Sequence, residues 1–187
     1  MFIDLSVFVS KASRKSALDS EKIVAYGHMG THFDVMNQSF PLDLLRRDAI
    51  VFDVRSFASQ EIDLAHINLD LIEPHSFVAF CSGYSSICPY GTKDYFANHP
   101  QLSHLLIDAL LHKEISILGV DFAGVRRGVE HTSTDQRCAD QGVFIVENLC
   151  NLESVLNGLP YARCLIYTFP VNFDGMTGLP CRVVAEF

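Results

Sequence analysis

The sequence predicts a single α/β domain built on a mixed, largely antiparallel sheet. Short apolar runs of strand length recur along the 187 residues and are rich in Val, Ile and Phe. Far fewer segments show helical spacing, whereas a doubly wound parallel fold needs a helix after nearly every strand. No repeat, low-complexity tract or linker-like change in composition divides the chain, so we expect one domain over residues 1–187.

The predicted strands are apolar segments separated by polar, glycine-containing or proline-containing stretches. In chain order they are residues 2–9 (FIDLSVFV), 22–27 (KIVAYG), 49–54 (AIVFDV), 76–82 (SFVAFCS), 115–121 (ISILGVD), 142–149 (GVFIVENL), 162–169 (ARCLIYTF) and 181–187 (CRVVAEF). The β-branched and aromatic content of these runs favours strands over short buried helices.

Helices are expected at three places between these strands. The clearest is amphipathic, because its apolar residues recur at i, i+3, i+4, i+7 and i+8: Leu102, Leu105, Leu106, Ala109 and Leu110. A second helix is predicted from Thr134 to Gln141, ending at Gly142, a residue that readily takes the left-handed conformation of a helix end. A third is predicted from Leu152 to Asn157, before Gly158.

Charge and cysteine usage narrow the functional classes. The formal net charge is −8 and no cluster of basic residues exceeds a pair such as Arg46-Arg47 or Arg126-Arg127, which argues against nucleic-acid binding. No apolar run reaches the ~18 residues of a membrane span, and the N-terminal charges follow the apolar part, the wrong order for a secretory signal. The six cysteines form no CxxC pair, so we expect reduced thiols in a cytoplasmic protein.

The stretch HMGTHFD brings His28, His32 and Asp34 together within residues 28–34. Histidines four residues apart would share a helix face, but Gly30 and Thr31 argue against a helix. We expect a turn at the glycine and then a strand, with His32 and Asp34 on one face. Two imidazoles and a carboxylate suit Zn²⁺, Mn²⁺ or Fe²⁺. On these residues alone, a polar loop with hydrogen-bonded histidines is an equally good interpretation.

The order of motifs along the chain resembles that of the cyclase family, whose best-known members are bacterial kynurenine formamidases. HMGTHFD resembles the family signature His-x-Gly-Thr-His-x-Asp. Further segments resemble the family in the same order: FIDLS at 2–6, NHPQLSHLLIDALLHKEISILGVD at 98–121, GVFIVENLCNLESV at 142–155 and FPVNFDGMTGLPCRVVA at 169–185.

The resemblance implies a swivelling β/β/α-type domain that forms a homodimer or homotetramer. It also implies a metal-dependent hydrolase, arylformamidase-like in class, that cleaves a formamide, lactone or cyclic amide of a small molecule. One or two divalent ions, zinc or manganese, would bind to His28, His32 and Asp34 by motif position. Glu147 would complete the site and accept a proton. A carboxylate at the surface end of a strand is the alternative for Glu147, although Val143, Ile145 and Leu149 suggest that it shares their buried strand face, where an unpaired charge is costly.

Two positions depart from the family pattern. Where the family has a ligand histidine twelve residues before Glu147, this chain has Asp135. Asp135 is expected to bind metal, or alternatively to be a polar residue near a helix start, and His131, one helical turn earlier, could reach the site instead. Where the family has its acid/base histidine, this chain has Gln38, and Met36 replaces the proline before it. An amide cannot exchange a proton near neutral pH.

These departures leave alternatives open. The first hypothesis is a hydrolase with Gln38 at the catalytic position. The second is a catalytically impaired binding or regulatory protein that retains a metal site. The third is a protein in which the metal has a purely structural role. Phe33, with Tyr84 and Tyr90 of the predicted loop CSGYSSICPYG at 81–91, would border the substrate, unless these aromatic residues serve ordinary packing. The remaining histidines are expected to be surface or hydrogen-bonded structural residues: His66, His75, His99, His104 and His112.

Overall fold

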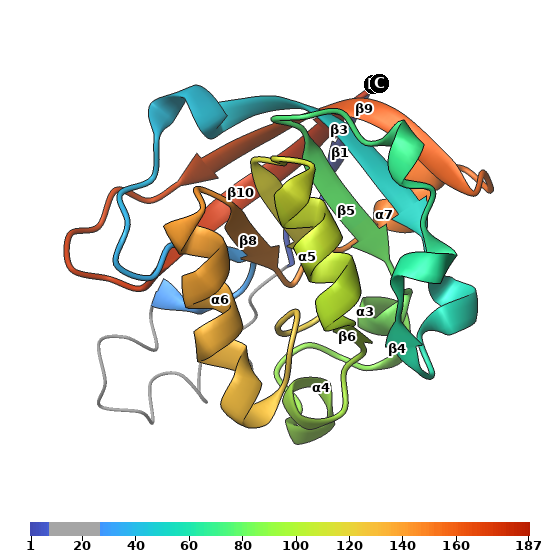
Figure 1. Ribbon diagram of the computed structural model, residues 1–187, viewed down its shortest axis with the longest axis horizontal. Coiled ribbons are helices and arrows are strands. Elements are labelled where there is room, and N and C mark those ends of the chain that lie inside the picture. Colours follow the sequence, from blue (N-terminus) through green and yellow to red (C-terminus); the bar gives the residue numbers. More distant parts are fainter. Residues whose placement is uncertain (8–26) are drawn as a thin grey trace.

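A mixed β-sheet organises the described part of the computed structural model, residues 1–7 and 27–187 (Figure 1). Its strands are β1 (Phe2–Asp4), β2 (His32–Asp34), β3 (Arg46–Asp53), β5 (Phe77–Cys81), β7 (Ile117–Val120), β8 (Phe144–Glu147), β9 (Tyr161–Pro170) and β10 (Gly178–Glu186). Their order is β1-β10-β2-β8-β7-β5-β3-β9, and β9 also pairs with β10. The sheet therefore closes into a barrel of seven strands in the described residues, with β1 added outside on β10.

The centre of the sheet is parallel and its flanks are antiparallel. β3, β5, β7 and β8 pair in parallel, whereas β2, β9, β10 and β1 join antiparallel. The predicted mixed sheet is confirmed, but "largely antiparallel" describes only the flanks. Every residue of β5 and β7 is buried. A strand that is buried on both faces has an uninterrupted run of apolar residues in the sequence. The parallel strands at the centre of the sheet show such runs.

The face of the sheet outside the barrel is covered by α3 (Tyr84–Ile87), α4 (Lys93–Ala97), α5 (His104–His112) and α6 (His131–Asp140). Helix α7 (Leu152–Leu156) packs instead against the core inside the barrel. Short 3-10 helices occupy Leu42–Leu45, Arg55–Phe57, Leu64–His66, Leu69–Leu71 and Gly128–Glu130, and a small parallel pair joins β4 (Glu61–Ile62) to β6 (Gln101–Leu102). Figure 1 shows α5 and α6 side by side in front of the strands.

The three predicted helices are present, with shifted ends. The Ser103 hydroxyl accepts the Leu106 N–H and caps α5, so Leu102 lies in the strand before the helix and Leu105 is exposed. The buried stripe of α5 is instead Leu106, Ile107 and Leu110. α6 begins earlier than expected, at His131, and the segment predicted as a loop at 81–91 contains the helical turn α3. The strand predicted at 22–27 falls almost wholly outside the described residues.

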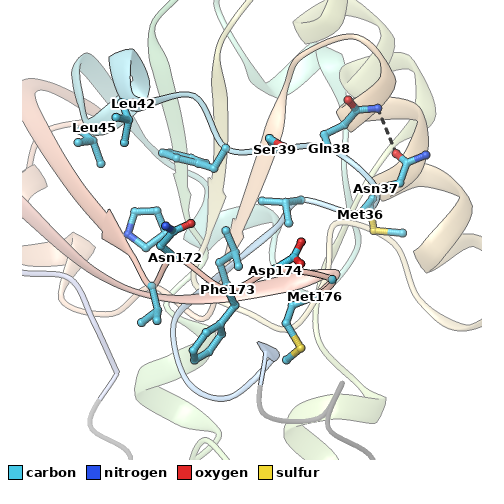
Figure 2. A pocket seen from close by; sticks show the side chains of 16 residues that line it. Met36, Asn37, Gln38, Ser39, Leu42, Leu45, Asn172, Phe173, Asp174 and Met176 are labelled. Carbon is cyan, nitrogen blue, oxygen red and sulfur yellow. Dashed lines mark hydrogen bonds between the residues drawn. The ribbon is translucent and has the colours of Figure 1, made fainter.

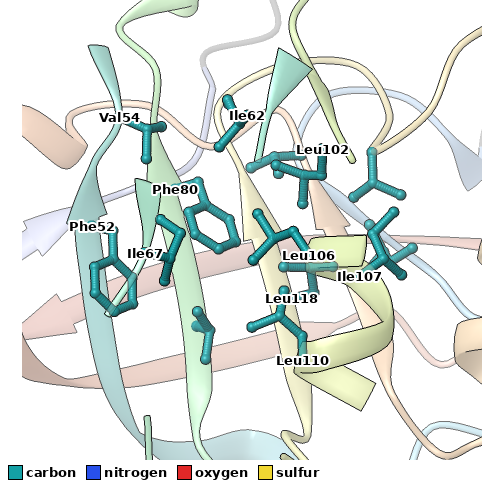
Figure 3. Packing of buried hydrophobic residues seen from close by; sticks show 14 of the residues in the cluster. Phe52, Val54, Ile62, Ile67, Phe80, Leu102, Leu106, Ile107, Leu110 and Leu118 are labelled. Atoms are coloured by element: carbon teal, nitrogen blue, oxygen red, sulfur yellow. The ribbon is translucent and has the colours of Figure 1, made fainter. Parts of the chain in front are cut away.

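The core has two parts, one on each face of the sheet. One lies between the strands and α5, where Leu106 and Leu110 pack near Phe80 and Leu118 (Figure 3). The other fills the barrel, with side chains from β2, β5, β8, β10 and α7. Successive residues of β8 alternate between the two: Phe144 and Val146 face the barrel, while Ile145 faces the helices. Glu147 therefore shares the helix-facing side with Ile145 and Val143, as predicted. Leu149, expected on the same side, faces the barrel instead, because the left-handed turn at Asn148 ends the strand alternation.

Two further sequence expectations can be compared with the described residues. All six cysteines are free thiols, either buried or partly buried. None of the helices in the described ranges combines the length and apolarity needed to cross a bilayer.

Candidate metal centre

The pairing of β2 with β8 brings the predicted ligands together. Its antiparallel register sets His32 opposite Glu147. His32 Nε2 lies 3.6 Å from Glu147 Oε2 and 3.6 Å from Asp34 Oδ1. All three side chains are almost fully buried. His32 and Asp34 thus share one face of a strand, as their spacing predicts, while Phe33 between them points into the barrel.

Helix α6 adds two groups from the other side of the site. His131 and Asp135 lie one turn apart, and His131 Nε2 is 3.1 Å from Asp135 Oδ2 and 3.3 Å from Glu147 Oε1. The histidine ring lies against Gly124, where an added Cβ would be 2.7 Å from His131 Cε1. Gly124 also has a φ of +113°, a conformation that residues with side chains rarely adopt. The two alternatives offered by the sequence, Asp135 and His131, are therefore both brought to the site.

His28 closes the site from the segment before β2. Its Nδ1 is 3.0 Å from Asp34 Oδ1, and its Nε2 is 2.9 Å from the Thr177 hydroxyl. The ring lies against Gly178, where a Cβ would be 2.8 Å from His28 Cε1. The first residue of β10 must therefore be a glycine for His28 to take this position.

The donor atoms form two groups that share Asp34. His28, His32 and Asp34 form one, and Asp34, His131, Asp135 and Glu147 form the other; within each group the ligand atoms lie within 4.8 Å of one another. Four buried atoms here have no hydrogen-bond partner among residues 1–7 and 27–187: His32 Nε2, Asp34 Oδ2, Asp135 Oδ1 and Glu147 Oε1. Buried polar atoms are nearly always paired. Imidazole and carboxylate donors suit zinc or manganese, so these residues fit a divalent cation.

Proton affinities in the cluster are shifted strongly by its burial and by its own charges. Burial and the charge of Asp34 raise the pKa of Asp135 to about 8, and the same two causes raise the pKa of Glu147 well above its usual range. Burial alone would lower the pKa of His32, but Asp34 and Glu147 raise it to about 9. Burial also opposes ionisation of Asp34, yet the neighbouring histidines outweigh it and hold its pKa well below normal. Without a cation, the excess negative charge is balanced by protons.

Comparison with known proteins identifies the family. The sequence model of the Cyclase family, "Putative cyclase", matches residues 3–126, about two thirds of the chain. This chain belongs to the cyclase family. A comparison with curated protein sequences finds no match.

Several solved structures share the fold of this cyclase-family chain along almost its whole length. A "potential metal-dependent hydrolase with cyclase activity" is 21% identical with a TM-score of 0.72, covering 99% of this chain and 96% of the other. Isatin hydrolase A from Ralstonia solanacearum is 16% identical with a TM-score of 0.75, covering 99% and 91%. Isatin hydrolase A from Labrenzia aggregata, bound to benzyl benzoate, is 17% identical with a TM-score of 0.74, covering 99% and 93%. At these identities the similarity establishes the shared fold.

Gln38, at the acid/base position of the cyclase family, is exposed in the loop after β2. Its amide donates to Asn37 Oδ1, which also accepts a hydrogen bond from Gln136 of α6. Gln38 lines a cavity of about 770 Å³ between residues 35–45 and the β9–β10 connection (Figure 2). That lining includes none of the described candidate metal ligands, so this cavity is not the metal centre itself.

The aromatic residues expected around the substrate occupy three different environments. Phe33 is fully buried against Phe40, so the expectation that it borders a substrate is wrong. It was misplaced because a residue between two ligands on a strand faces the opposite side. Tyr84 is buried in the core and donates to Asp94 O. Tyr90 is half-buried, and its hydroxyl accepts the Gly30 N–H at 2.7 Å, directly beside the ligand segment.

Two residues at the site were not singled out from the sequence. Thr177 contacts His28, and Asn148 contacts the Gly30 carbonyl. Asn148 carried one signal, because it directly follows the candidate ligand Glu147 at a strand end. Thr177 carried none, since it is 149 residues from His28 in sequence.

Proposed function

We propose that this cyclase-family protein is a metal-dependent hydrolase that cleaves an amide or ester bond of a small molecule. The proposal depends mainly on one observation: four buried ligand atoms that lack hydrogen-bond partners in the described part of the chain converge around Asp34, which belongs to both ligand groups. The proteins of the same fold described as a metal-dependent hydrolase and as isatin hydrolases support hydrolysis as the reaction class.

Zinc or manganese is the cation that this donor set favours. His28, His32 and Asp34 would hold one ion, and Asp34, His131, Asp135 and Glu147 would hold a second. When bound, such a cation polarises a substrate carbonyl and lowers the pKa of water so that hydroxide forms near neutral pH.

The protein's own residues define the open side of the site. His32, Asp34, Asp135 and Glu147 are at most 4% exposed, whereas the His28 and His131 side chains are 33% and 34% exposed. A small substrate would therefore approach past the two histidines. Tyr90 lies near the same opening, through its hydrogen bond to Gly30.

Glu147 is the proposed proton acceptor of the reaction. Its Oε1 is buried and accepts no hydrogen bond from the described residues, so this oxygen is available to take a proton. His131 Nε2, 3.3 Å from Glu147 Oε1, connects this buried carboxylate to solvent. These two residues would replace part of the proton transfer that Gln38 cannot perform.

A second candidate function is a binding or regulatory protein that keeps the metal but not the chemistry. The exposed position of Gln38 favours it, because the amide bonds to Asn37 and to none of the ligand side chains in the described residues. Such a protein would bind a small molecule at the cation without turning it over.

Metal analysis combined with turnover separates these functions. Purified protein would be stripped with a chelator and reloaded with zinc or manganese. It would then be assayed with an activated ester, a lactone and an aryl formamide. We expect bound metal and metal-dependent hydrolysis of at least the ester. Metal binding without turnover would favour the binding protein, and absence of bound metal at every loading would overturn both functions.

A further inference from the structure

The peptide group of Gly30 is held from both sides within the ligand segment. Its N–H donates to the Tyr90 hydroxyl at 2.7 Å. Its carbonyl oxygen lies 2.9 Å from His32 Nδ1 and accepts a hydrogen bond from Asn148 Nδ2, also at 2.9 Å. An oxygen this close requires the hydrogen on Nδ1. The lone pair of Nε2 is then free to face Asp34 and Glu147, as a metal ligand requires.

The Asn148 amide is held between the Tyr95 hydroxyl and the Gly30 carbonyl, and the carbonyl, which can only accept, selects its orientation. The Tyr95 hydroxyl donates to Asn148 Oδ1 at 2.9 Å, which leaves Nδ2 toward Gly30 O. A flipped amide would place two oxygens against each other at that distance. Both side chains are 1% exposed, so water does not compete for these bonds.

Asn148 also has a backbone role that must be distinguished from its side-chain role. Its φ is +59°, a left-handed conformation that asparagine tolerates better than most residues with side chains. The turn redirects the chain directly after Glu147, so that Leu149 faces the barrel core rather than the helices. An asparagine here could therefore serve the backbone alone, and the experiment must keep the turn while removing the amide.

We infer that Asn148, held by Tyr95, is a positioning residue that fixes the Gly30 carbonyl and through it the ring of His32. The inference depends on the metal site of the proposed function. Hydrogen bonds to the far nitrogen of a ligand histidine set the ring orientation, and their loss typically weakens metal binding on the order of 10–100-fold. Asn148 would contribute by holding the oxygen that His32 needs.

Three variants isolate this role. Asn148→Gly keeps the positive φ at low cost but removes the amide. Tyr95→Phe removes only the hydroxyl that holds it. Tyr84→Phe is the matched control. The Tyr84 ring packs at a tilt against Tyr95, with ring centroids 5.5 Å apart, and its hydroxyl donates to Asp94 O, away from Asn148.

The readouts are the dissociation constant of zinc ion, measured by chelator competition, and the Nδ1–H signal of His32 in nitrogen-15 NMR of the zinc-loaded protein. We expect Asn148→Gly to weaken zinc binding by about 10-fold or more, with Tyr95→Phe intermediate. Both should broaden or shift the Nδ1–H signal. Tyr84→Phe should lower thermal stability about as much as Tyr95→Phe without changing zinc affinity.

Each result decides between the positioning role and a structural one. Equal zinc affinity in Tyr95→Phe and Tyr84→Phe, with an unchanged His32 signal, overturns the inference, even if Asn148→Gly fails to fold. If wild-type protein binds zinc and all variants bind it equally, this inference fails and the proposed metal site stands. If wild-type protein binds neither zinc nor manganese, both fail; if it binds only manganese, the same comparison of variants is made with manganese.

Discussion

The buried and exposed halves of the candidate metal centre are built differently. His32, Asp34 and Glu147 come from paired strands and are at most 4% exposed. His28 and His131 come from a preceding segment and the start of a helix, and their side chains are about one third exposed. Sheet register holds the first group rigidly, so its charges cannot move apart and need a cation or protons. The exposed histidines can adjust, which suits an opening for substrate.

The largest expected effect comes from the residue that both ligand groups share. Asp34→Asn removes the anionic oxygen from each group, so bound metal should fall to background and hydrolysis should fall with it. Elemental analysis of the purified variant measures the first effect and ester turnover the second. Asp53→Asn is the matched control, because Asp53 is a carboxylate at a strand end that pairs with Arg55 away from the site. Retention of full metal content by Asp34→Asn would contradict the bridging role.

Substitution of the exposed histidines should have smaller and separable effects. His28→Ala removes a donor from one group only, and His131→Ala removes one from the other. We expect each variant to keep one ligand group intact and to lose metal only from the altered group, as measured by titration with zinc. His112→Ala, at the exposed end of α5, serves as the control. Complete loss of metal in both variants would show that the two groups bind a single ion cooperatively.

The stability of the metal-free protein should depend on pH in a direction set by the buried half. The folded-state pKa values of Asp135, about 8, and His32, about 9, lie above their unfolded values. Folding therefore takes up protons, and the stabilisation present at low pH is lost as pH rises from each group's unfolded pKa to its folded pKa. The loss is complete near pH 8 for Asp135 and near pH 9 for His32. Asp34 acts oppositely, but its contribution is complete well below pH 6.

We expect the free energy of unfolding of the metal-free protein to fall by about 2 kcal/mol between pH 6 and 8. Denaturant unfolding at several pH values measures this. Zinc should restore stability most at the higher pH, because the cation replaces the protons. A flat stability profile in the metal-free protein would show that the carboxylates are hydrated rather than buried.

The sequence predicted the buried half better than its surroundings. The spacing of His32 and Asp34 suffices to place them on one strand face, and the apolar alternation around Glu147 suffices to place it on a buried one. Their convergence could be anticipated only through the family resemblance, because the β2–β8 pairing joins residues more than one hundred positions apart. The closure of the barrel could not be read from the sequence of any single strand, because the sequence of a strand does not specify which other strand it pairs with.

Failures of prediction share a physical cause. Phe33 was placed at the substrate although strand alternation turns it into the core. Leu105 was placed on the buried face of α5 because the stripe was counted from Leu102, before the cap at Ser103 starts the helix. In both cases the residue type was compatible with two positions, and only the exact register of the element decides between them.

The smallest expected effect concerns Gln38, which lies outside both halves of the site. An amine leaves poorly without a proton, so wild-type protein should hydrolyse activated esters faster than aryl formamides. Gln38→His should raise formamide turnover more than ester turnover. The gain should be at most about tenfold, below the 10²–10⁴ of a well-positioned acid/base, because Gln38 is exposed and bonds only to Asn37 among the described side chains.

Gln38→Ala is the control and should leave both rates unchanged, since the amide does not transfer a proton near neutral pH. A large loss of formamide turnover in Gln38→Ala would instead show that the amide itself contacts the substrate. Robust formamide turnover in the wild-type protein that Gln38→Ala leaves unchanged would point to Glu147 or His131 as the proton carrier, since Glu147 Oε1 and His131 Nε2 lie 3.3 Å apart.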